Sequence, residues 1–231
     1  MEMNYWAVVP AAGVGRRMQA GLPKQYLLLN GRRVIDWTLE VLLAEPRIRG
    51  VYVALGAEDP FWESCEHAGH PRVRRVAGGE ERAHSVLSAL LALETEAAPA
   101  DRVLVHDAAR PCLRPEDLSK LLELASGEAG GLLAMPVRDT MKRADAEGRS
   151  ETTLDRSRIW HAFTPQLFPL ATLRDALEQA LAAGVAVTDE ASAMEWAGNR
   201  PRLVEGHPDN IKITRPGDLE LAGFYLQKRN A

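Results

Sequence analysis

Residues 4–18 read NYWAVVPAAGVGRRM: an apolar run stops at a turn of small residues, and two arginines follow at once. The apolar run over 5–9 is expected to form a strand. Because its apolar residues are continuous rather than alternating, that strand should be covered on both faces. The same pattern recurs along the chain and predicts further strands over 50–55, 73–77, 102–106 and 131–136.

Amphipathic stretches separate these strands. Apolar residues three and four positions apart predict helices over 34–44, 82–93, 116–125 and 170–181. The alternation of strands and helices predicts an α/β fold with a doubly wound, mainly parallel sheet, which binds ligands at the carboxyl ends of its strands. The polar segment 138–158 breaks the alternation and is long for a plain connection. We expect it to leave the sheet as a β-arm or a lid, and a disordered surface loop is the alternative.

The composition narrows the class of protein. A chain of 231 residues fits one large α/β domain or two small ones. Because its net charge is −4, a polyanion would have to bind at a local cluster of basic residues. Cys65 and Cys112 offer neither a disulfide framework nor zinc spacing, which fits a reducing compartment. The sequence shows no apolar stretch of bilayer-spanning length and no basic segment before its first apolar run. We therefore expect a cytoplasmic protein that binds neither nucleic acid nor membrane.

The small-residue turn over 10–15 lets an anion approach the backbone closely. A dinucleotide fingerprint would need glycine where Met18 stands, and a Walker A loop would need Gly-Lys-Ser/Thr. Arg16, Arg17 and Lys24 follow the turn and could stabilise charge during phosphoryl or nucleotidyl transfer. On these residues alone, a sharp turn followed by a solvated basic face explains the pattern equally well.

The larger pattern PAAGVGRRM…GLPKQY resembles the nucleotidyltransferases that join sugar or polyol phosphates to nucleotides. The closest resemblance is to the 2-C-methyl-D-erythritol 4-phosphate cytidylyltransferases of the non-mevalonate isoprenoid route. Further blocks follow in family order over essentially the whole chain: GGEERAHSV (78–86), VHDAARP (105–111), DTMK (139–142), TPQ (164–166), TDEAS (188–192), and Gly206 with DNIKIT (209–214). The resemblance implies one nucleotidyltransferase (glycosyltransferase-A-like) domain over 1–231. It also implies a homodimer in which the arm 138–158 reaches the partner subunit.

The resemblance also implies roles for individual residues. Arg17 and Lys24 would act on the triphosphate of CTP, and Arg156 and Lys212 on the phosphate of the acceptor. Together these four are the expected catalytic residues. Further substrate contacts are expected from Ala11, Ala12, Gly13, Gly15, Gly79, Glu80, Ser85, Asp107, Ala108, Arg110, Thr140, Thr164 and Thr188.

A divalent cation, Mg²⁺, is the expected cofactor. Asp107 follows the strand over 102–106 and could hold a cation that bridges triphosphate oxygens. A capping or turn aspartate is the alternative. Asp209 is a weaker second candidate ligand, because a turn explains it nearly as well. His67 and His70 lie near Cys65, but they supply too few ligands for a zinc site.

The function implied by the resemblance is a cytidylyl transfer. The phosphate of 2-C-methyl-D-erythritol 4-phosphate would attack the α-phosphorus of CTP in line, giving CDP-methylerythritol and pyrophosphate. Two alternatives stay open. One is a cytidylyltransferase for another polyol phosphate, such as ribitol 5-phosphate, and the other is an inactive nucleotide-binding homologue. The expected partners are therefore CTP, a polyol phosphate and a second copy of the chain.

Overall fold

A computed structural model describes residues 3–13 and 21–229. Within these residues the central sheet has seven strands in the order β11-β7-β10-β6-β1-β4-β5. β1, β4, β5 and β6 are parallel, and β7 is parallel to β11, whereas β10 is antiparallel to both β6 and β7. The strand bounds are β1 Tyr5–Pro10, β4 Ile48–Leu55, β5 Val73–Ala77, β6 Arg102–Val105, β7 Gly131–Pro136, β10 Trp160–Pro169 and β11 Arg202–Glu205.

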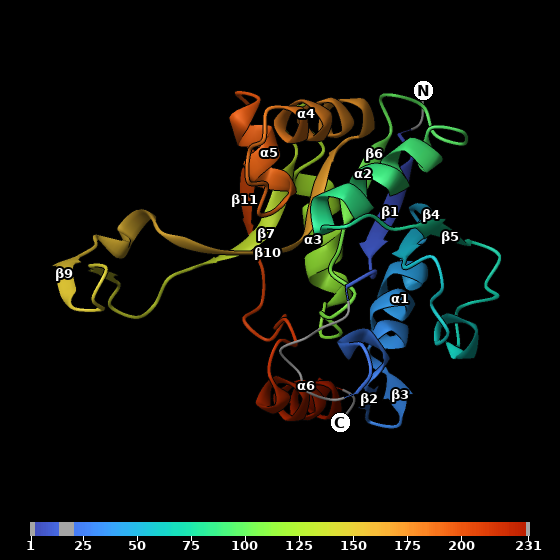
Figure 1. The fold of residues 1–231 in the computed structure, drawn as a ribbon, viewed down its shortest axis with the longest axis horizontal. Coiled ribbons are helices and arrows are strands. Elements are labelled where there is room, and N and C mark those ends of the chain that lie inside the picture. Colours follow the sequence, from blue (N-terminus) through green and yellow to red (C-terminus); the bar gives the residue numbers. More distant parts are fainter. Residues whose placement is uncertain (1–2, 14–20, 230–231) are drawn as a thin grey trace.

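Helices cover both faces of this sheet (Figure 1). Successive residues of β1 face opposite cores: Ala7 and Val9 belong to the cluster with α1 and α3, and Val8 to the cluster with α2, α4 and α5. This is the reason for the continuous apolar run, because each face of the strand is buried. The helix bounds are α1 Val34–Ala44, α2 Arg82–Leu93, α3 Pro115–Leu124, α4 Leu170–Ala182, α5 Glu190–Trp196 and α6 Pro216–Arg229.

The chain adds smaller elements around the sheet. A short hairpin of β2 (Leu28–Leu29) and β3 (Arg32–Arg33) packs beside α6, where the Asn30 side chain donates to the Gly223 carbonyl at 3.0 Å. In the described part of the chain, the single-turn helices are η2 (Lys24–Tyr26), η3 (Trp62–Ser64) and η4 (Arg156–Arg158). Among the described residues, no helix combines the length and the apolar character needed to cross a bilayer.

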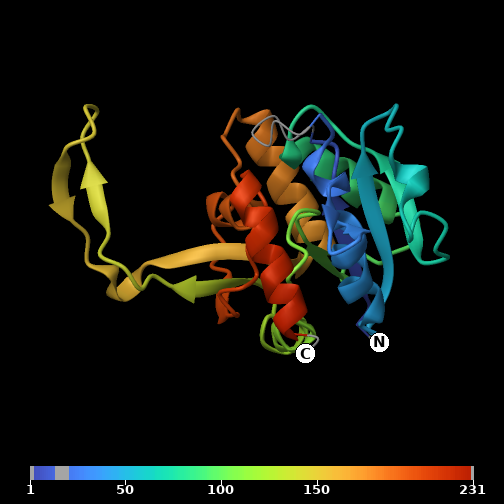
Figure 2. The ribbon, with the colours of Figure 1, turned by 90° about the horizontal axis from the view of Figure 1, so that it is seen from below.

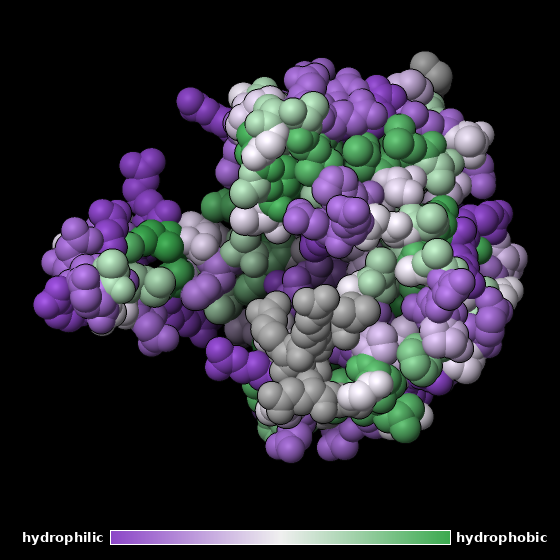
Figure 3. Space-filling model, in the orientation of Figure 1, coloured by the Kyte–Doolittle hydropathy of each residue, from purple (hydrophilic) through white to green (hydrophobic). Residues whose placement is uncertain are grey.

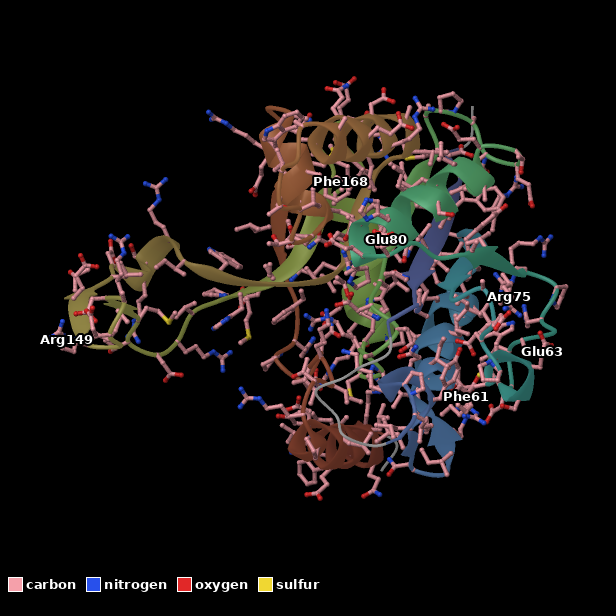
Figure 4. The ribbon with its side chains drawn as sticks, viewed as in Figure 1. Phe61, Glu63, Arg75, Glu80, Arg149 and Phe168 are labelled. Atoms are coloured by element: carbon pink, nitrogen blue, oxygen red, sulfur yellow. The ribbon has the colours of Figure 1, made fainter. Side chains whose placement is uncertain are left out.

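A second hairpin projects from the sheet (Figures 1 and 2). Its strands β8 (Lys142–Ala144) and β9 (Ser150–Thr153) pair antiparallel, and all of their residues are exposed. The surface of this projection is mostly hydrophilic (Figure 3), and Arg149 lies at its far end (Figure 4). Both strands lie within the segment 138–158, which was expected from the sequence to leave the sheet.

The carboxyl ends of β1, β4, β5 and β6 meet at one edge of the sheet. Residues 11–13 follow β1, and the loops after β5 and β6 lead to α2 and α3. These loops carry most of the residues singled out in the sequence, so the fold brings distant blocks of the chain to one place.

Candidate active site

A pocket of about 350 Å³ opens at the carboxyl ends of β1 and β6. It lies between the turn after β1, the turn before α2 and the segment that follows β6. It brings together these residues predicted from the sequence: Ala11, Ala12, Gly13, Lys24, Gly79, Glu80, Ser85, Asp107, Ala108 and Lys212. Gly15 and Arg17, which were also predicted, lie outside the described residues.

The turn after β1 is fixed by a buried glutamine. The side-chain amide of Gln25 donates to the carbonyl of Ala11 at 2.6 Å and to that of Gly13 at 3.1 Å. Gln25 lines the pocket, yet sequence reasoning did not single it out. The signal available was its position directly after Lys24 in the first family block.

The turn before α2 packs tightly against the turn after β1. A Cβ atom on Gly78 would lie 2.5 Å from the Cβ of Ala12, and one on Gly79 would lie 2.4 Å from the Cβ of His84. The Ser85 hydroxyl accepts from the Gly79 N–H at 3.0 Å. Glycine is needed here because two stretches of backbone approach one another closely, and this contact forms one wall of the pocket.

A second pocket of about 190 Å³ adjoins the first. Arg82, Asp107 and Lys212 line both pockets. The predicted residues Arg110, Thr164 and Thr188 line the second pocket. The two pockets therefore share one wall of charged side chains.

Asp107 is the centre of that wall. Its Oδ1 lies 3.0 Å from Nε of Arg82, and its Oδ2 lies 2.8 Å from Nζ of Lys212 and 3.3 Å from Nε of Arg110. Burial alone would raise the pKa of Asp107, but Arg82, Lys212 and Arg110 outweigh burial and hold that pKa well below its usual range. Asp107 is therefore an anion that organises three cations.

Arg82 is joined in turn to a second buried carboxylate. Its Nη1 lies 2.6 Å from Oε1 of Glu190, and its Nη2 lies 3.0 Å from Oε2. Burial works against the charged form of Arg82, but Glu190 and Asp107 raise its pKa above the ordinary value. Neither Arg82 nor Glu190 was predicted from the sequence, although both lie within family blocks.

A neutral histidine supports the wall from behind. The Thr164 hydroxyl accepts from the Asp107 N–H at 3.0 Å and donates to Nδ1 of His106 at 2.9 Å. Nε2 of His106 then carries the proton and donates to the Arg110 carbonyl at 3.2 Å. Burial lowers the pKa of His106 to about 3, so the ring is uncharged at neutral pH.

Lys24 and Lys212 approach the larger pocket from different parts of the chain. The Lys24 ammonium donates to the carbonyl of Ile213 at 2.9 Å, next to Lys212 in sequence. The segment that carries Lys212 is also tied to β10, because the Asn210 amide donates to the Thr164 carbonyl at 2.9 Å. The two lysines are thus positioned by backbone contacts around the same opening.

Three predicted residues lie away from both pockets. Thr140 and Arg156 are exposed near the projecting hairpin, where Arg156 donates to the carbonyl of Arg138. The carboxylate of Asp209 is paired with Arg114, whose Nη2 lies 2.6 Å from Oδ2. The lining residues of both pockets do not include these three.

Asp107 and Asp209, the two predicted metal ligands, do not form a preformed metal site. Both oxygens of Asp107 are already paired with cations, and Asp209 is paired outside the pockets. The part of the chain that the structure describes holds no cluster of three or more potential metal-ligating side chains. Three cationic side chains around Asp107 also disfavour a divalent cation at its carboxylate.

Comparisons with known proteins identify the family of this chain. Residues 5–228 match the family model described as IspD, 2-C-methyl-D-erythritol 4-phosphate cytidylyltransferase. Curated proteins of that name include one from Pseudomonas putida (strain W619), 56% identical over 94% of this chain and 93% of its own length. Another, from Ectopseudomonas mendocina (strain ymp), is 58% identical over 95% of this chain and 94% of its own.

Solved structures give the same result. The chain is similar to the 2-C-methyl-D-erythritol 4-phosphate cytidylyltransferase of Francisella tularensis, with a TM-score of 0.82, 37% identity, and coverage of 96% of this chain and 99% of that one. The enzyme of that name from Thermus thermophilus aligns with a TM-score of 0.78 and 31% identity over 98% of this chain and 100% of that one. The chain belongs to the 2-C-methyl-D-erythritol 4-phosphate cytidylyltransferase family.

Proposed function

We propose that this protein transfers CMP from CTP to 2-C-methyl-D-erythritol 4-phosphate, giving CDP-methylerythritol and pyrophosphate. The observation that carries the proposal is the pair of adjoining pockets with a common wall of Arg82, Asp107 and Lys212. A transfer between two phosphate-bearing substrates needs two sites that meet where the new bond forms. Membership of the family supplies the substrate identities.

In this proposal the nucleotide occupies the larger pocket. Its triphosphate lies against the turn after β1 and the ammonium of Lys24, and Arg17 acts on the same phosphates. The backbone of Gly79 and Glu80 faces the cytosine base, where fixed N–H and C=O groups can match its edge. Glu80 lies in the turn before α2, near the centre of Figure 4.

The polyol phosphate occupies the smaller pocket. Arg110, Thr188 and Lys212 are its proposed contacts, with Thr164 behind them. Its attacking oxygen is already ionised, so the reaction needs no general base. Side chains of this chain instead orient the attacking phosphate opposite the leaving pyrophosphate and neutralise the charge that both substrates bring together.

Mg²⁺, the expected cofactor, is best accommodated as a cation carried by the triphosphate. Its ligands would be phosphate oxygens and water, a common arrangement for Mg²⁺ at nucleotide sites. The paired state of Asp107 supports this assignment. When bound, the cation would neutralise part of the triphosphate charge.

We further propose a cytoplasmic homodimer in which the hairpin of β8 and β9 reaches the partner subunit. Thr140 and Arg156 would then contact the partner's acceptor phosphate. Their exposure, and their absence from the lining of either pocket of their own chain, support this arrangement. In a dimer, the site of a second copy of the chain would bring a substrate phosphate within reach of Thr140 and Arg156.

The decisive experiment measures pyrophosphate release with each of the common nucleoside triphosphates, offered with methylerythritol or ribitol phosphate. We expect turnover with CTP and 2-C-methyl-D-erythritol 4-phosphate. A preference for UTP would overturn the base assignment, and a preference for ribitol 5-phosphate would overturn the acceptor. Binding of CTP without turnover on any acceptor would indicate an inactive homologue.

A further inference from the structure

Glu190, the first residue of α5, is a fully buried carboxylate beside the proposed acceptor pocket. Its two oxygens are both paired with the guanidinium of Arg82, at 2.6 and 3.0 Å. Buried charges are rare unless paired, because removing them from water is costly. This pair joins the beginnings of α5 and α2, whose first residues lie 108 positions apart in sequence.

Helix stability alone does not explain the pair. A carboxylate in the first turn of α5 suits the positive end of the helix dipole, but an arginine in the first turn of α2 opposes it. Arg82 therefore sits at an electrostatically unfavourable helix position, which Glu190 and Asp107 compensate. The arrangement points to a role for the guanidinium itself.

Glu190 is held rigidly. Its neighbour Asp189 caps α5 through a reciprocal pair of hydrogen bonds with Ser192. The buried side chain of Gln166, on β10, accepts from the Ala191 N–H at 2.7 Å and donates to Asp189 at 2.9 Å. The start of α5 is thus fixed to the strand that carries Thr164, and a site built on fixed elements keeps its geometry.

Arg82 has donors to spare for a ligand. Within the described part of the chain, three of its five N–H groups are used, one on Asp107 and two on Glu190. The side chain lines both pockets and is 27% exposed. Two N–H groups of a planar guanidinium suit the oxygens of a phosphate.

We propose that Glu190 is a positioning residue that holds Arg82 at the wall between the two pockets, where Arg82 binds the phosphates during transfer. The inference rests on the proposed function. Without the Glu190 charge, Arg82 would compete with Lys212 and Arg110 for the two oxygens of Asp107. The cations of the wall would then lose the arrangement that places both substrates.

The test is Glu190→Gln, which keeps the size of the side chain and removes its charge. We expect kcat to fall by about tenfold to a hundredfold, the scale of a misplaced catalytic group, with a smaller change in KM for CTP. Glu190→Asp should recover part of the loss because it restores the charge. The double variant Arg82→Ala/Glu190→Gln should be no slower than Arg82→Ala, because Glu190 acts through Arg82.

The matched control is Asp101→Asn. Asp101 is also buried, but it precedes β6, at the end of that strand opposite Asp107, and accepts from Trp6 at 3.0 Å. This variant should lower the melting temperature without changing kcat per folded molecule. Kinetics are normalised to the folded fraction by circular dichroism. If Glu190→Gln does not fold, Arg82→Lys is measured instead; it keeps the charge but cannot pair with both oxygens of Glu190, so kcat should fall.

The inference is overturned if Glu190→Gln keeps kcat within twofold of the wild type, or, where that variant does not fold, if Arg82→Lys does. Multiplying losses in the double variant would also overturn it, since they would show an effect of Glu190 independent of Arg82. Failure of the proposed function gives a different result: the wild-type protein itself would form no CDP-methylerythritol. The two failures are therefore distinguishable in the same assay.

Discussion

At the residue scale, the wall between the pockets shows how charge is arranged before substrates arrive. Asp107 pairs with Arg82, Arg110 and Lys212, so each cation is already oriented and partly desolvated. Preorganised cations stabilise developing charge at little reorganisation cost. Lys24 approaches from another part of the chain, and its ammonium donates to the backbone carbonyl of Ile213.

Lys24→Ala is therefore expected to lower turnover by about two to three orders of magnitude while the fold survives. Lys24 begins η2 and lines the larger pocket, where we propose that the triphosphate binds. Pyrophosphate release measures the loss. Lys120 is a matched control, since its ammonium also donates to a backbone carbonyl, that of Glu205 at 2.6 Å, outside both pockets. Near-wild-type release from Lys24→Ala, or an equal loss in Lys120→Ala, would remove Lys24 from the mechanism.

His106 gives a pH prediction with a definite sign. Burial lowers its pKa in the folded protein to about 3, against an ordinary value of 6.5. Between these values the unfolded chain binds the proton and the folded chain does not, so the free energy of unfolding falls as pH drops. The stabilising contribution is complete above about pH 6.5 and is lost by up to about 1.4 kcal/mol per pH unit below it.

His106→Gln removes this titration. Denaturant unfolding from about pH 6.5 to about pH 4.5 should give a shallower decline in the free energy of unfolding than for the wild type. The slope is the quantity to compare, because the substitution also changes the absolute stability. Equal slopes would mean that His106 binds its proton as readily in the folded protein as in the unfolded chain, which contradicts the lowered pKa.

At the element scale, the larger pocket depends on the contact between two turns. Gly78, before α2, lies so close to Ala12 that an added methyl group would stand 2.5 Å from its Cβ. Since neither backbone can move without shifting a strand end or a helix start, the pocket wall itself must give way. This contact makes the shape of the nucleotide site sensitive to a single methyl group.

Gly78→Ala should consequently destabilise the fold by about 1–3 kcal/mol, the usual cost of overpacking, and raise KM for CTP more than KM for the acceptor. Gly127→Ala is the control, because a Cβ there meets nothing within 4 Å. Thermal unfolding and initial rates at varied CTP measure the two effects. A Gly78→Ala enzyme that binds CTP like the Gly127→Ala enzyme would show that the turn has room to adapt.

The elements differ in how well the sequence predicts them. The predicted strands β1, β4, β5, β6 and β7 are confirmed. The apolar runs of β1, β4, β6 and β7 follow from the burial of these strands, whereas β5 lies at the sheet edge and exposes Arg74 and Arg75. β10 was not predicted, since it begins with exposed or half-buried residues and contains Pro165. β11 is a short edge strand with mostly exposed residues, so its apolar signal is weak.

The residues of the site also differ in how well the sequence predicts them. Glycine turns and basic residues close in sequence to a strand end can be read from one chain, and the predicted residues of the larger pocket do lie together. The pair of Arg82 and Glu190 spans two helices that meet only in the folded molecule. Such a pair has no local sequence pattern, because each residue alone looks like an ordinary charged residue on a helix.

At the scale of the whole molecule, the described contacts within one chain do not explain how the projecting hairpin is stabilised. β8 and β9 are exposed throughout, and a small two-stranded hairpin is marginally stable on its own. Thr140 precedes the hairpin and Arg156 follows it, and both are exposed and absent from the lining of the pockets. A second subunit would give the hairpin a surface to pack on and would give these residues a substrate.

A mixed-dimer experiment tests this arrangement. One subunit carries Arg156→Ala and the other Lys212→Ala, and each homodimer is expected to be almost inactive. If the hairpin serves the partner's site, one site of the mixed dimer combines Lys212 of one chain with Arg156 of the other, so about half of the wild-type activity per dimer returns. If each hairpin serves its own site, every site keeps one defect and no activity returns. Mixing under conditions that exchange subunits, followed by pyrophosphate release, distinguishes the two outcomes, and sedimentation of the wild type shows whether a dimer forms.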